Sequence, residues 1–449
     1  MSSRAARERS RLLDAYRAAH PECQRLAGRA RRTIPGGITH DIRHLPPFPV
    51  YVSHAGGSRK RDVDGQEYVD YWMGHGALFL GHCHPAVVNA IQEQAARGTH
   101  LGACHEAEVV WAELVQRLIP SAEMVRFTMS GTEATHLALR LARAYTARPK
   151  AIKLTGHFHG WHDGVAAGVH PPFDLPLSAG VPGATLDQIL LCHPNDPKAV
   201  HRLIERGDVA AVILEPAGGQ AGLIPTVPGY LQELRALTTR ERVVLIFDEV
   251  ITGFRYAPGG AQAYFGVTPD LTTLAKIMAG GLPGGAVVGK REIMALIAHR
   301  DDPSWDRSER VAHAGTFNAN PLSAAAGIAT LEAVADGTLH ARANKLGEEL
   351  RAALGEVMRR VGAPGAVFGE SSIFHLSFEG RPGLAGFDRP RNNALYHLLR
   401  CALLVNGVDC SLYHGWVSAV HTEEDIARTV RAYENGLSAM AAEGWFKGI

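Results

Sequence analysis

The chain has 449 residues, a length that predicts about two or three domains. Apolar residues make up 46% and charged residues 20%, and a formal net charge of +1 gives no basic field for nucleic acid and no acidic tail for a basic partner. The longest apolar runs, such as "VAAVIL", are too short for a membrane span.

The N-terminal stretch "MSSRAARERSRLLDAYRAAH" is rich in arginine but has no long apolar segment. It therefore predicts an exposed amphipathic first helix and not a secretory signal. Six cysteines without a C-x-x-C pair are typical of reduced thiols, so we expect a cytoplasmic enzyme. Residues 47–72 predict a meander of strands with a turn at Asp64-Gly65.

Short apolar runs alternate with helical patterns through the middle of the chain. Helical patterns such as "EATHLALRLARAY" and "YLQELRALTTRER" lie between several of the runs. This alternation predicts a large α/β domain over 76–325 with a mostly parallel sheet that is buried on both faces. The predicted strands are residues 124–129, 150–154, 188–192, 209–214, 242–247 and 285–289.

The two ends of the chain have a different character from the middle. After about residue 326 the sequence predicts one long helix ("ATLEAVADGTLHARANKLGEELRAALGEVMRRVG"), short strands ("SSIFHLSFEG") and further helices. We expect residues 326–449 to join residues 1–75 in a second, smaller α+β domain.

One lysine stands inside an apolar run, in "PDLTTLAKIMAGGLPGGAVVG" (269–289). Lysine is rarely buried unless a group pairs or reacts with it. Lys276 is therefore a candidate functional residue.

Polar residues follow several predicted strands, at the edge where open α/β sheets bind their ligands. Ser130-Gly131-Thr132-Glu133 begins a helix, so its backbone N–H groups could bind a phosphate. The same residues also fit a capping box, which needs no ligand.

Three further strand ends bring an aromatic residue and acids to the same edge. Phe158 and His159 follow one strand, Glu215 another with Gln220 close behind, and Asp248 a third. A carboxylate directly after an apolar strand needs a cationic or hydrogen-bonded partner, although Asp248 could also be a helix cap or a satisfied core acid.

Together these residues form a set that pyridoxal phosphate requires. Its phosphate needs backbone donors, its ring a stacking partner, its pyridine nitrogen a carboxylate, and its aldehyde a lysine amine for a Schiff base. Desolvation lowers the pKa of a lysine and keeps its amine nucleophilic, which explains Lys276 in an apolar run.

Six ordered motifs resemble those of the class III, fold type I aminotransferases, in particular the branch containing glutamate-1-semialdehyde aminomutase. They are "SGTEATHLALRLARAYT", "GHFHGWHDG", "ILEP", "LIFDEVITGFR", "DLTTLAKIMAGGLPGGAVVG" and "HAGTFNANPLSAAAG". Within this branch, "MGHGALFLGHCHP", "GHFHGWHD" and "AGGLPGG" are most similar to D-phenylglycine aminotransferase.

The resemblance implies a large domain with a seven-stranded, mostly parallel sheet, and a homodimer with active sites at the interface. It also implies that Lys276 forms the Schiff base and moves the proton, while Arg43 binds the substrate carboxylate. The other implied cofactor contacts are Asp248 at the pyridine nitrogen, Val250 and Phe158 on the two ring faces, Ser130, Gly131 and Thr132 at the phosphate, and Thr316 at the phosphate of the neighbouring subunit's cofactor.

The chain also departs from the aminomutase pattern. Gly74 and His75 replace a serine and a tryptophan, and the stretch "VAAGVHPPFDLPLSAGVPG" does not match the glycine- and serine-rich gating loop. We therefore expect an aminotransferase acting on an amino acid and a 2-oxo acid, with an aminomutase or an epimerase as the alternatives. His75 is a candidate for the substrate pocket, and other candidates are Trp72, His159 and His414.

Other classes of protein fit less well. "GHCHP" places His82, Cys83 and His84 next to one another, whereas zinc sites need spaced ligands, so we expect no metal. "GGLPGG" comes too late in the chain for a dinucleotide-binding loop. A non-enzymatic binding protein would not require Lys276 and Asp248 together.

Overall fold

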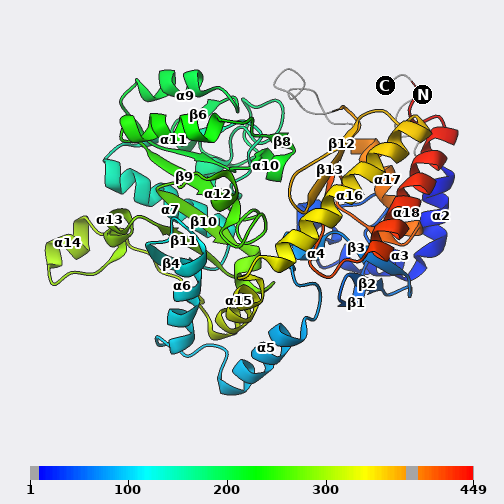
Figure 1. Cartoon of the computed structure of the whole chain (residues 1–449), viewed down its shortest axis with the longest axis horizontal. Coiled ribbons are helices and arrows are strands. Elements are labelled where there is room, and N and C mark those ends of the chain that lie inside the picture. Colours follow the sequence, from blue (N-terminus) through cyan, green and yellow to red (C-terminus); the bar gives the residue numbers. More distant parts are fainter. Residues whose placement is uncertain (1–9, 381–392, 448–449) are drawn as a thin grey trace.

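Seven strands form the central sheet in the order β4-β11-β10-β9-β7-β5-β6, and only β11 runs antiparallel to its neighbours. The computed structural model describes residues 10–380 and 393–447, and this sheet occupies the left half of Figure 1. The strands are β4 Met124–Thr128, β5 Lys150–Leu154, β6 Ile189–Cys192, β7 Val209–Leu214, β9 Val244–Asp248, β10 Leu271–Ala275 and β11 Gly285–Gly289.

The six predicted strands are all present, with ends that agree within two residues. The seventh strand, β10, was not among them and is a correction. Two threonines, Thr272 and Thr273, interrupt its apolar pattern, yet both are fully buried. Their hydroxyls are satisfied by other side chains, since Thr272 contacts Ser121 and Thr273 contacts Asp248.

The central sheet is buried on both faces, as predicted. Alternate residues of β7 and β9 belong to two different core clusters, because successive side chains of a strand point to opposite faces. One cluster packs Ile213 and Ile246 against α7 (Gly131–Thr146). The other packs Val212 and Leu245 against α9 (Pro197–Ile204) and α11 (Tyr230–Arg240).

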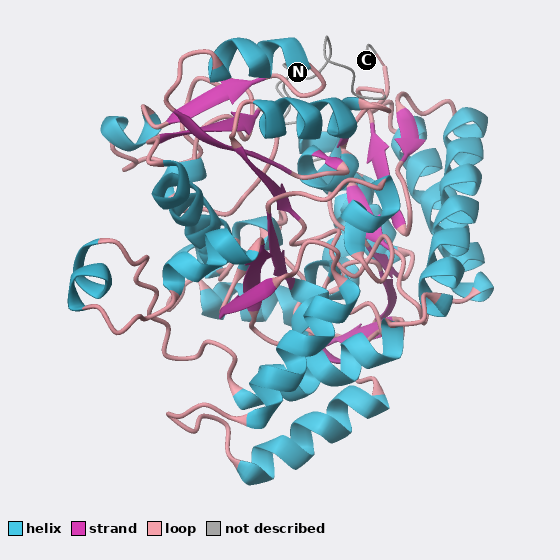
Figure 2. Ribbon diagram, turned by 60° about the vertical axis from the view of Figure 1, so that its left-hand side comes forward, coloured by secondary structure: helices cyan, strands magenta, loops and turns pink. Residues whose placement is uncertain are grey.

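Further helices surround this sheet, and Figure 2 shows them on its flanks. The remaining helices here are α5 Pro85–Arg97, α6 Glu106–Leu118, α8 Gly183–Leu186, α10 Gly219–Gly222, α12 Gly260–Phe265, α13 Arg291–Met294, α14 Pro303–Ser308 and α15 Pro321–Val334. Short elements are η1 Pro35–Gly37, η2 Asp41–Arg43, η3 Asp163–Val165, η4 Lys276–Ala279, η5 Ala295–Ile297 and β8 Ile224–Pro225.

The two ends of the chain form two smaller sheets, of which the first contains strands from both ends and the second only C-terminal strands. The first has the order β1-β2-β3-β14, in which the pairing of β3 with β14 joins N-terminal and C-terminal residues, and the second has the order β12-β13-β15. The predicted meander is confirmed, and Gly65 in its turn has a φ of +85°. The strands are β1 Val52–Gly56, β2 Arg59–Asp62, β3 Glu67–Asp70, β12 Ala366–Phe368, β13 Ile373–Ser377, β14 Val408–Asp409 and β15 His414–Trp416.

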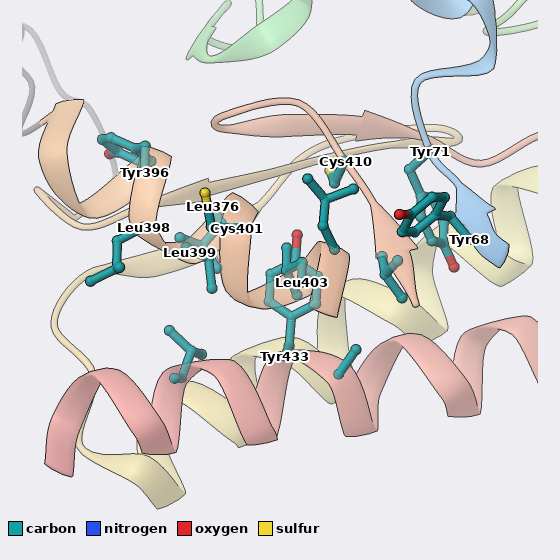
Figure 3. Packing of buried hydrophobic residues seen from close by; sticks show 14 of the residues in the cluster. Tyr68, Tyr71, Leu376, Tyr396, Leu398, Leu399, Cys401, Leu403, Cys410 and Tyr433 are labelled. Carbon is teal, nitrogen blue, oxygen red and sulfur yellow. The ribbon is translucent and has the colours of Figure 1, made fainter. Parts of the chain in front are cut away.

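Helices from both ends of the chain lie side by side around these sheets (Figure 1). Their shared core contains aromatic, leucine and cysteine side chains, including Tyr68, Tyr71, Leu399, Cys410 and Tyr433 (Figure 3). The boundaries expected at residues 75 and 325 stay a prediction. The helices are α2 Arg11–Ala19, α3 Pro21–Ala30, α4 Met73–Gly76, α16 Thr338–Val361, α17 Asn393–Val405 and α18 Glu423–Ala442.

Two predicted helices can be compared in detail. The amphipathic first helix is present as α2, whose Leu13 and Tyr16 are buried in the core, while residues 1–9 of the predicted stretch lie outside the described residues. The long helix expected after residue 328 is interrupted between α15 and α16, where Gly337 has a φ of +79° that ends one helix and precedes the next.

Candidate active site

The candidate residues lie at one edge of the central sheet, as expected. Strands β4, β5, β7, β9 and β10 are mutually parallel in direction, so their carboxyl ends meet there. Ser130, Glu215 and Lys276 directly or almost directly follow three of these strands, and Asp248 ends a fourth.

The loop before α7 provides backbone donors. The N–H groups of Gly131 and Thr132 lie in the first turn of α7, where no intrahelical acceptor exists. Ser130 Oγ accepts the N–H of Glu133 at 3.2 Å, as in a capping box, but Glu133 Oε2 accepts the N–H of Met129 at 2.6 Å instead of completing the box. The cap and an anion site at the remaining N–H groups are therefore compatible.

Glycine is required at two positions around these donors. A Cβ atom on Gly131 would lie 2.8 Å from Val250 Cγ2, and a Cβ atom on Gly160 would lie 2.6 Å from Thr132 Oγ1. Val250 therefore packs directly on the start of α7. This places a proposed ring contact beside the proposed phosphate contacts.

Asp248 is buried and held by three partners. Its Oδ2 atom accepts from His159 Nδ1 at 2.7 Å, and its Oδ1 atom accepts from the hydroxyl of Thr273 and the N–H of Val250, both at 3.1 Å. Burial lowers the pKa of His159, although Asp248 opposes the shift. His159 thus supports Asp248 from behind, a role that the sequence did not indicate.

Glu215 organises the loop that follows β7. Its carboxylate accepts the N–H groups of Phe158, Gln220 and Ala221 at 3.0, 2.8 and 2.8 Å. Burial and the neighbouring Asp248 raise its pKa to about 7, while the three N–H donors oppose this. Glu215 therefore positions Phe158 and Gln220 through the backbone.

Lys276 follows β10 in a left-handed backbone conformation, with a φ of +55°. Its side chain is only partly buried, although its neighbours Ala275 and Ile277 are buried. Burial lowers its pKa to about 8, and the carboxylates of Asp248 and Glu215 oppose this shift. Among the described residues, none makes a hydrogen bond or ion pair with its amine, which leaves this amine available.

A cationic and aromatic group faces Lys276. The exposed Arg43 donates to Thr39 Oγ1 at 2.8 Å, and the rings of His40 and His75 stack 5.0 Å apart. Burial, together with the neighbouring His40, Arg43 and Lys276, lowers the pKa of His75 to about 4. Besides burial, Arg43 and Lys276 also lower the pKa of His40, so these two cations and the two histidines lie in one region.

Four other predicted residues have different surroundings. Phe158 is 45% exposed, which leaves its ring free to cover a ligand. The rings of Trp72 and His75 meet edge to face, with their centroids 4.9 Å apart. Thr316 lies on an exposed loop, where its carbonyl accepts from His100 Nε2 at 2.6 Å. The ring of His414 packs against that of Trp416, with centroids 4.6 Å apart.

The structure adds two buried cations that the sequence analysis missed. Lys153 of β5 is fully buried, donates to the carbonyl of Ala167, and has its pKa lowered by burial to about 7. Arg255 is also fully buried and lowers the pKa of Lys276. A lysine inside the strand "KAIKL" was a signal of the first, whereas Arg255 ends the motif "LIFDEVITGFR" but received no role from the sequence.

His82 and Cys83 of "GHCHP" have separate partners. His82 pairs with Asp70 at 2.7 Å, whereas the thiol of Cys83 donates to the carbonyl of Ala55. Within residues 10–380 and 393–447, one group of possible metal ligands comes together, formed by Cys23, Asp62 and Asp64. None of the helices in this part of the chain has the length and apolar content to cross a membrane.

Pyridoxal phosphate fits the residues assembled at this edge. The first turn of α7 offers free N–H donors, Gly131 leaves room for close approach, Asp248 is a buried carboxylate fixed by His159, and Lys276 is an unpaired amine. Each of these cofactor contacts falls to a different residue of the set.

Comparison with known proteins agrees with this reading. Residues 42–379 match the family model for aminotransferase class-III. A glutamate-1-semialdehyde 2,1-aminomutase from Methanosarcina acetivorans is 43% identical over 421 residues, which cover 91% of this chain and 96% of that protein.

Solved structures show the same architecture. An omega-transaminase from Sphaerobacter thermophilus has a TM-score of 0.86 at 35% identity, covering 93% of this chain and 98% of its own. A transaminase with PLP bound has a TM-score of 0.86 at 33% identity, covering 95% and 99%. The expected fold type I architecture is thus confirmed, and the chain belongs to the class-III aminotransferase family.

Proposed function

We propose that this protein is a pyridoxal-phosphate-dependent aminotransferase that moves an amino group between an amino acid and a 2-oxo acid. One observation carries the proposal: Lys276, an amine without a hydrogen-bond or ion-pair partner among the described residues and with a pKa lowered to about 8, follows β10 at the sheet edge where Asp248 ends β9 and Glu215 follows β7. The expected alternatives, an aminomutase and an epimerase, share the same first step, which is proton removal at Cα.

The cofactor contacts divide among the strand ends. The first turn of α7, with Ser130, Gly131 and Thr132, would bind the phosphate, while Val250 and Phe158 would cover the ring. Asp248, fixed by His159, would hold the proton on the pyridine nitrogen. Bound pyridoxal phosphate supplies the electron sink for the electrons released at Cα.

Lys276 would hold the cofactor's aldehyde and then move the proton. Its pKa of about 8 lies near physiological pH, so that its amine can accept a proton and return it. Asp248 and Glu215 keep this pKa from falling further. Burial thus lowers the pKa of Lys276, and the two carboxylates limit that decrease.

Arg43 would bind the substrate carboxylate. It is exposed, its guanidinium is anchored at one end by Thr39, and the pKa values of His40 and His75 both respond to its charge and to that of Lys276. A planar guanidinium binds a carboxylate with two parallel hydrogen bonds, which fixes the substrate's orientation. The neutral His40 and His75 add no charge that would compete for it.

Release of the product after one half-reaction favours amino transfer over an internal amino shift. An aminomutase must retain its intermediate, which requires a segment that closes over the site. Here residues 165–183 lack the glycine- and serine-rich pattern of the aminomutase gating loop. This departure in sequence is the feature that favours amino transfer. The 43% identity to an aminomutase keeps the amino shift as the second candidate.

A homodimer would complete the site. Large apolar side chains are exposed beside it, including Trp161 at 78%, Phe317 at 53% and Leu101 at 49%. Such a patch is typical of an interface. Thr316, next to Phe317, would reach the cofactor phosphate of the neighbouring subunit.

A screen of half-reactions tests the proposal. The pyridoxal form is mixed with L- and D-amino acids, and both loss of its absorbance band and release of the 2-oxo acid are followed. We expect stoichiometric oxo acid without an added acceptor. Isomerisation or racemisation of a substrate with no free oxo acid would instead identify a mutase or an epimerase.

A charge variant tests the carboxylate assignment. Arg43→Ala should raise KM for every active amino acid by about 10- to 100-fold, because a charge-assisted pair is lost. Arg25→Ala is the matched control, since Arg25 is exposed on α3 and pairs only locally with Glu22. Equal KM values for wild type and Arg43→Ala would refute the assignment.

A further inference from the structure

The short helix α4 (Met73–Gly76) is left-handed. Four consecutive residues have positive φ, namely Met73 at +42°, Gly74 at +60°, His75 at +60° and Gly76 at +83°. This conformation is unfavourable for residues that carry a Cβ atom, as Met73 and His75 do. Strained backbone of this kind persists only where the surroundings fix it, and it clusters at functional sites.

The start of this left-handed turn is held by Asp70. Its carboxylate accepts the N–H groups of Trp72 and Met73 at 2.9 and 3.2 Å. The same carboxylate pairs with Lys60 at 2.8 Å and with His82 at 2.7 Å, so it is itself fixed. These charges hold the pKa of Asp70 well below its usual range and keep it an acceptor.

The end of the turn is held by Arg255. One guanidinium nitrogen, Nη2, donates to the carbonyl of Gly76 at 2.7 Å. The other, Nη1, donates to Ser372 Oγ and to the carbonyl of Val417, both at 3.2 Å. Gly76 is also confined on its other side, because a Cβ atom there would lie 3.1 Å from the indole of Trp416. Arg255 therefore joins the turn to the loops flanking β13 and β15.

Burying the charge of Arg255 costs free energy that a purely structural role would not require. It is fully buried, and no carboxylate among the described residues forms an ion pair with it. Burial lowers its pKa to about 9, and its charge is met by three neutral oxygen acceptors and by the ring of Phe79, 5.3 Å from the guanidinium carbon. A buried charge without a counterion destabilises a fold, so a gain elsewhere is expected.

That gain is the placement of His75. The turn directs its ring onto His40 and against the edge of Trp72, in the region shared with Arg43 and Lys276. A relaxed right-handed turn would send the side chain elsewhere, because the direction of Cβ follows the backbone.

We propose that Arg255 is a positioning residue that holds the left-handed turn Met73–Gly76 and thereby keeps His75 in the substrate pocket. The effect on substrate rests on the function proposed above, whereas the effect on the turn does not. The hydrogen bonds of Arg255 go to Ser372, Val417 and Gly76, none of which is a proposed cofactor or substrate contact. Its action is therefore indirect, through Gly76.

The first experiment measures amide hydrogen exchange in the apoprotein. Arg255→Lys keeps the charge but loses the fork that bonds three acceptors at once, and we expect exchange in residues 73–78 to rise by about tenfold or more. Arg351→Lys is the matched control, because Arg351 donates to the carbonyls of Ser371 and Ile373 without contacting the turn. Unchanged exchange in residues 73–78 of Arg255→Lys would overturn the proposal, whatever the enzyme's substrate is.

The second experiment separates positioning from general damage. If Arg255 acts through His75, Arg255→Lys should raise KM for the amino acid by about tenfold with less effect on kcat, and should add no further rise in a His75→Ala background. Additive effects of the two substitutions would refute the action through His75. Arg255→Gln, which also lacks the charge, should show at least the same rise in exchange if it folds. Should no amino acid react, the proposed function fails while the exchange result still decides the role of Arg255 in the turn.

Discussion

Replacing Gly131 by alanine tests the proposed phosphate site at its tightest point. The new Cβ atom would lie 2.8 Å from Val250 Cγ2 and 2.9 Å from Val250 Cγ1. Carbon atoms pack best about 3.5–4.0 Å apart, so either α7 or Val250 must shift. A shift of α7 displaces the N–H donors, and a shift of Val250 displaces a proposed ring contact.

The magnitude follows from the cost of overpacking. Extra methyl groups in a packed site cost about 1–3 kcal/mol. If this cost falls on cofactor binding, the dissociation constant for pyridoxal phosphate rises roughly 5- to 150-fold. Equilibrium dialysis or tryptophan quenching measures this constant directly. An unchanged constant in Gly131→Ala would refute the placement of the phosphate at the start of α7.

Two further variants sharpen this test. In Gly131→Ala/Val250→Ala both clashing atoms are gone, and the nearest remaining Val250 atom is Cβ at 3.4 Å. The double variant should therefore bind the cofactor better than the sum of the two single effects predicts. Gly28→Ala in α3 is the matched control, since nothing lies within 4 Å of its new Cβ atom and it should stabilise the helix by about 0.5–1 kcal/mol without affecting cofactor affinity.

The remaining predictions concern the reacting groups and assembly. Lys276→Ala should abolish turnover but still bind pyridoxal phosphate, and full activity would sink the assignment. Asp248→Ala should lower kcat by orders of magnitude with the fold retained, and unchanged kinetics would leave it a core acid only. In the apoprotein, acylation of Lys276 should rise with pH around a midpoint of about 8, because burial disfavours the charged amine, and a midpoint near the ordinary lysine value of 10.5 would contradict this. Thr316→Ala should weaken cofactor binding by about 1–2 kcal/mol, and sedimentation of a fully active monomer would exclude the shared site.

The residues at the strand ends could be predicted because their signal is local. An apolar run followed by Asp248 or Glu215 specifies both a strand and a polar group at its carboxyl end, and parallel strands bring such groups together. Strand β10 could not be predicted from an apolar run, because Thr272 and Thr273 are polar residues that are nevertheless buried in the sheet. Their partners, Ser121 and Asp248, come from distant parts of the chain.

The supporting residues could not be predicted for a similar reason. His159 and Arg255 act through bonds that span 89 and 179 positions, to Asp248 and Gly76, and no periodicity marks such pairs. Lys153 shows that an isolated lysine in an apolar run is not specific, because it is buried as deeply as any candidate and yet donates to a backbone carbonyl.

Strained backbone and buried charge occur together around this site, and the pairing explains how the site is built. His75, Gln220 and Lys276 all have positive φ values, between 52° and 60°. Glu215 accepts the N–H of Gln220, and Arg255 donates to the residue after His75. The segments of His75 and Gln220 are thus each held by a buried charged group, and such groups bond the backbone strongly in a dry environment. The same buried charges then shift the pKa of Lys276, down through Arg255 and up through Glu215, so the groups that hold the backbone also set the chemistry.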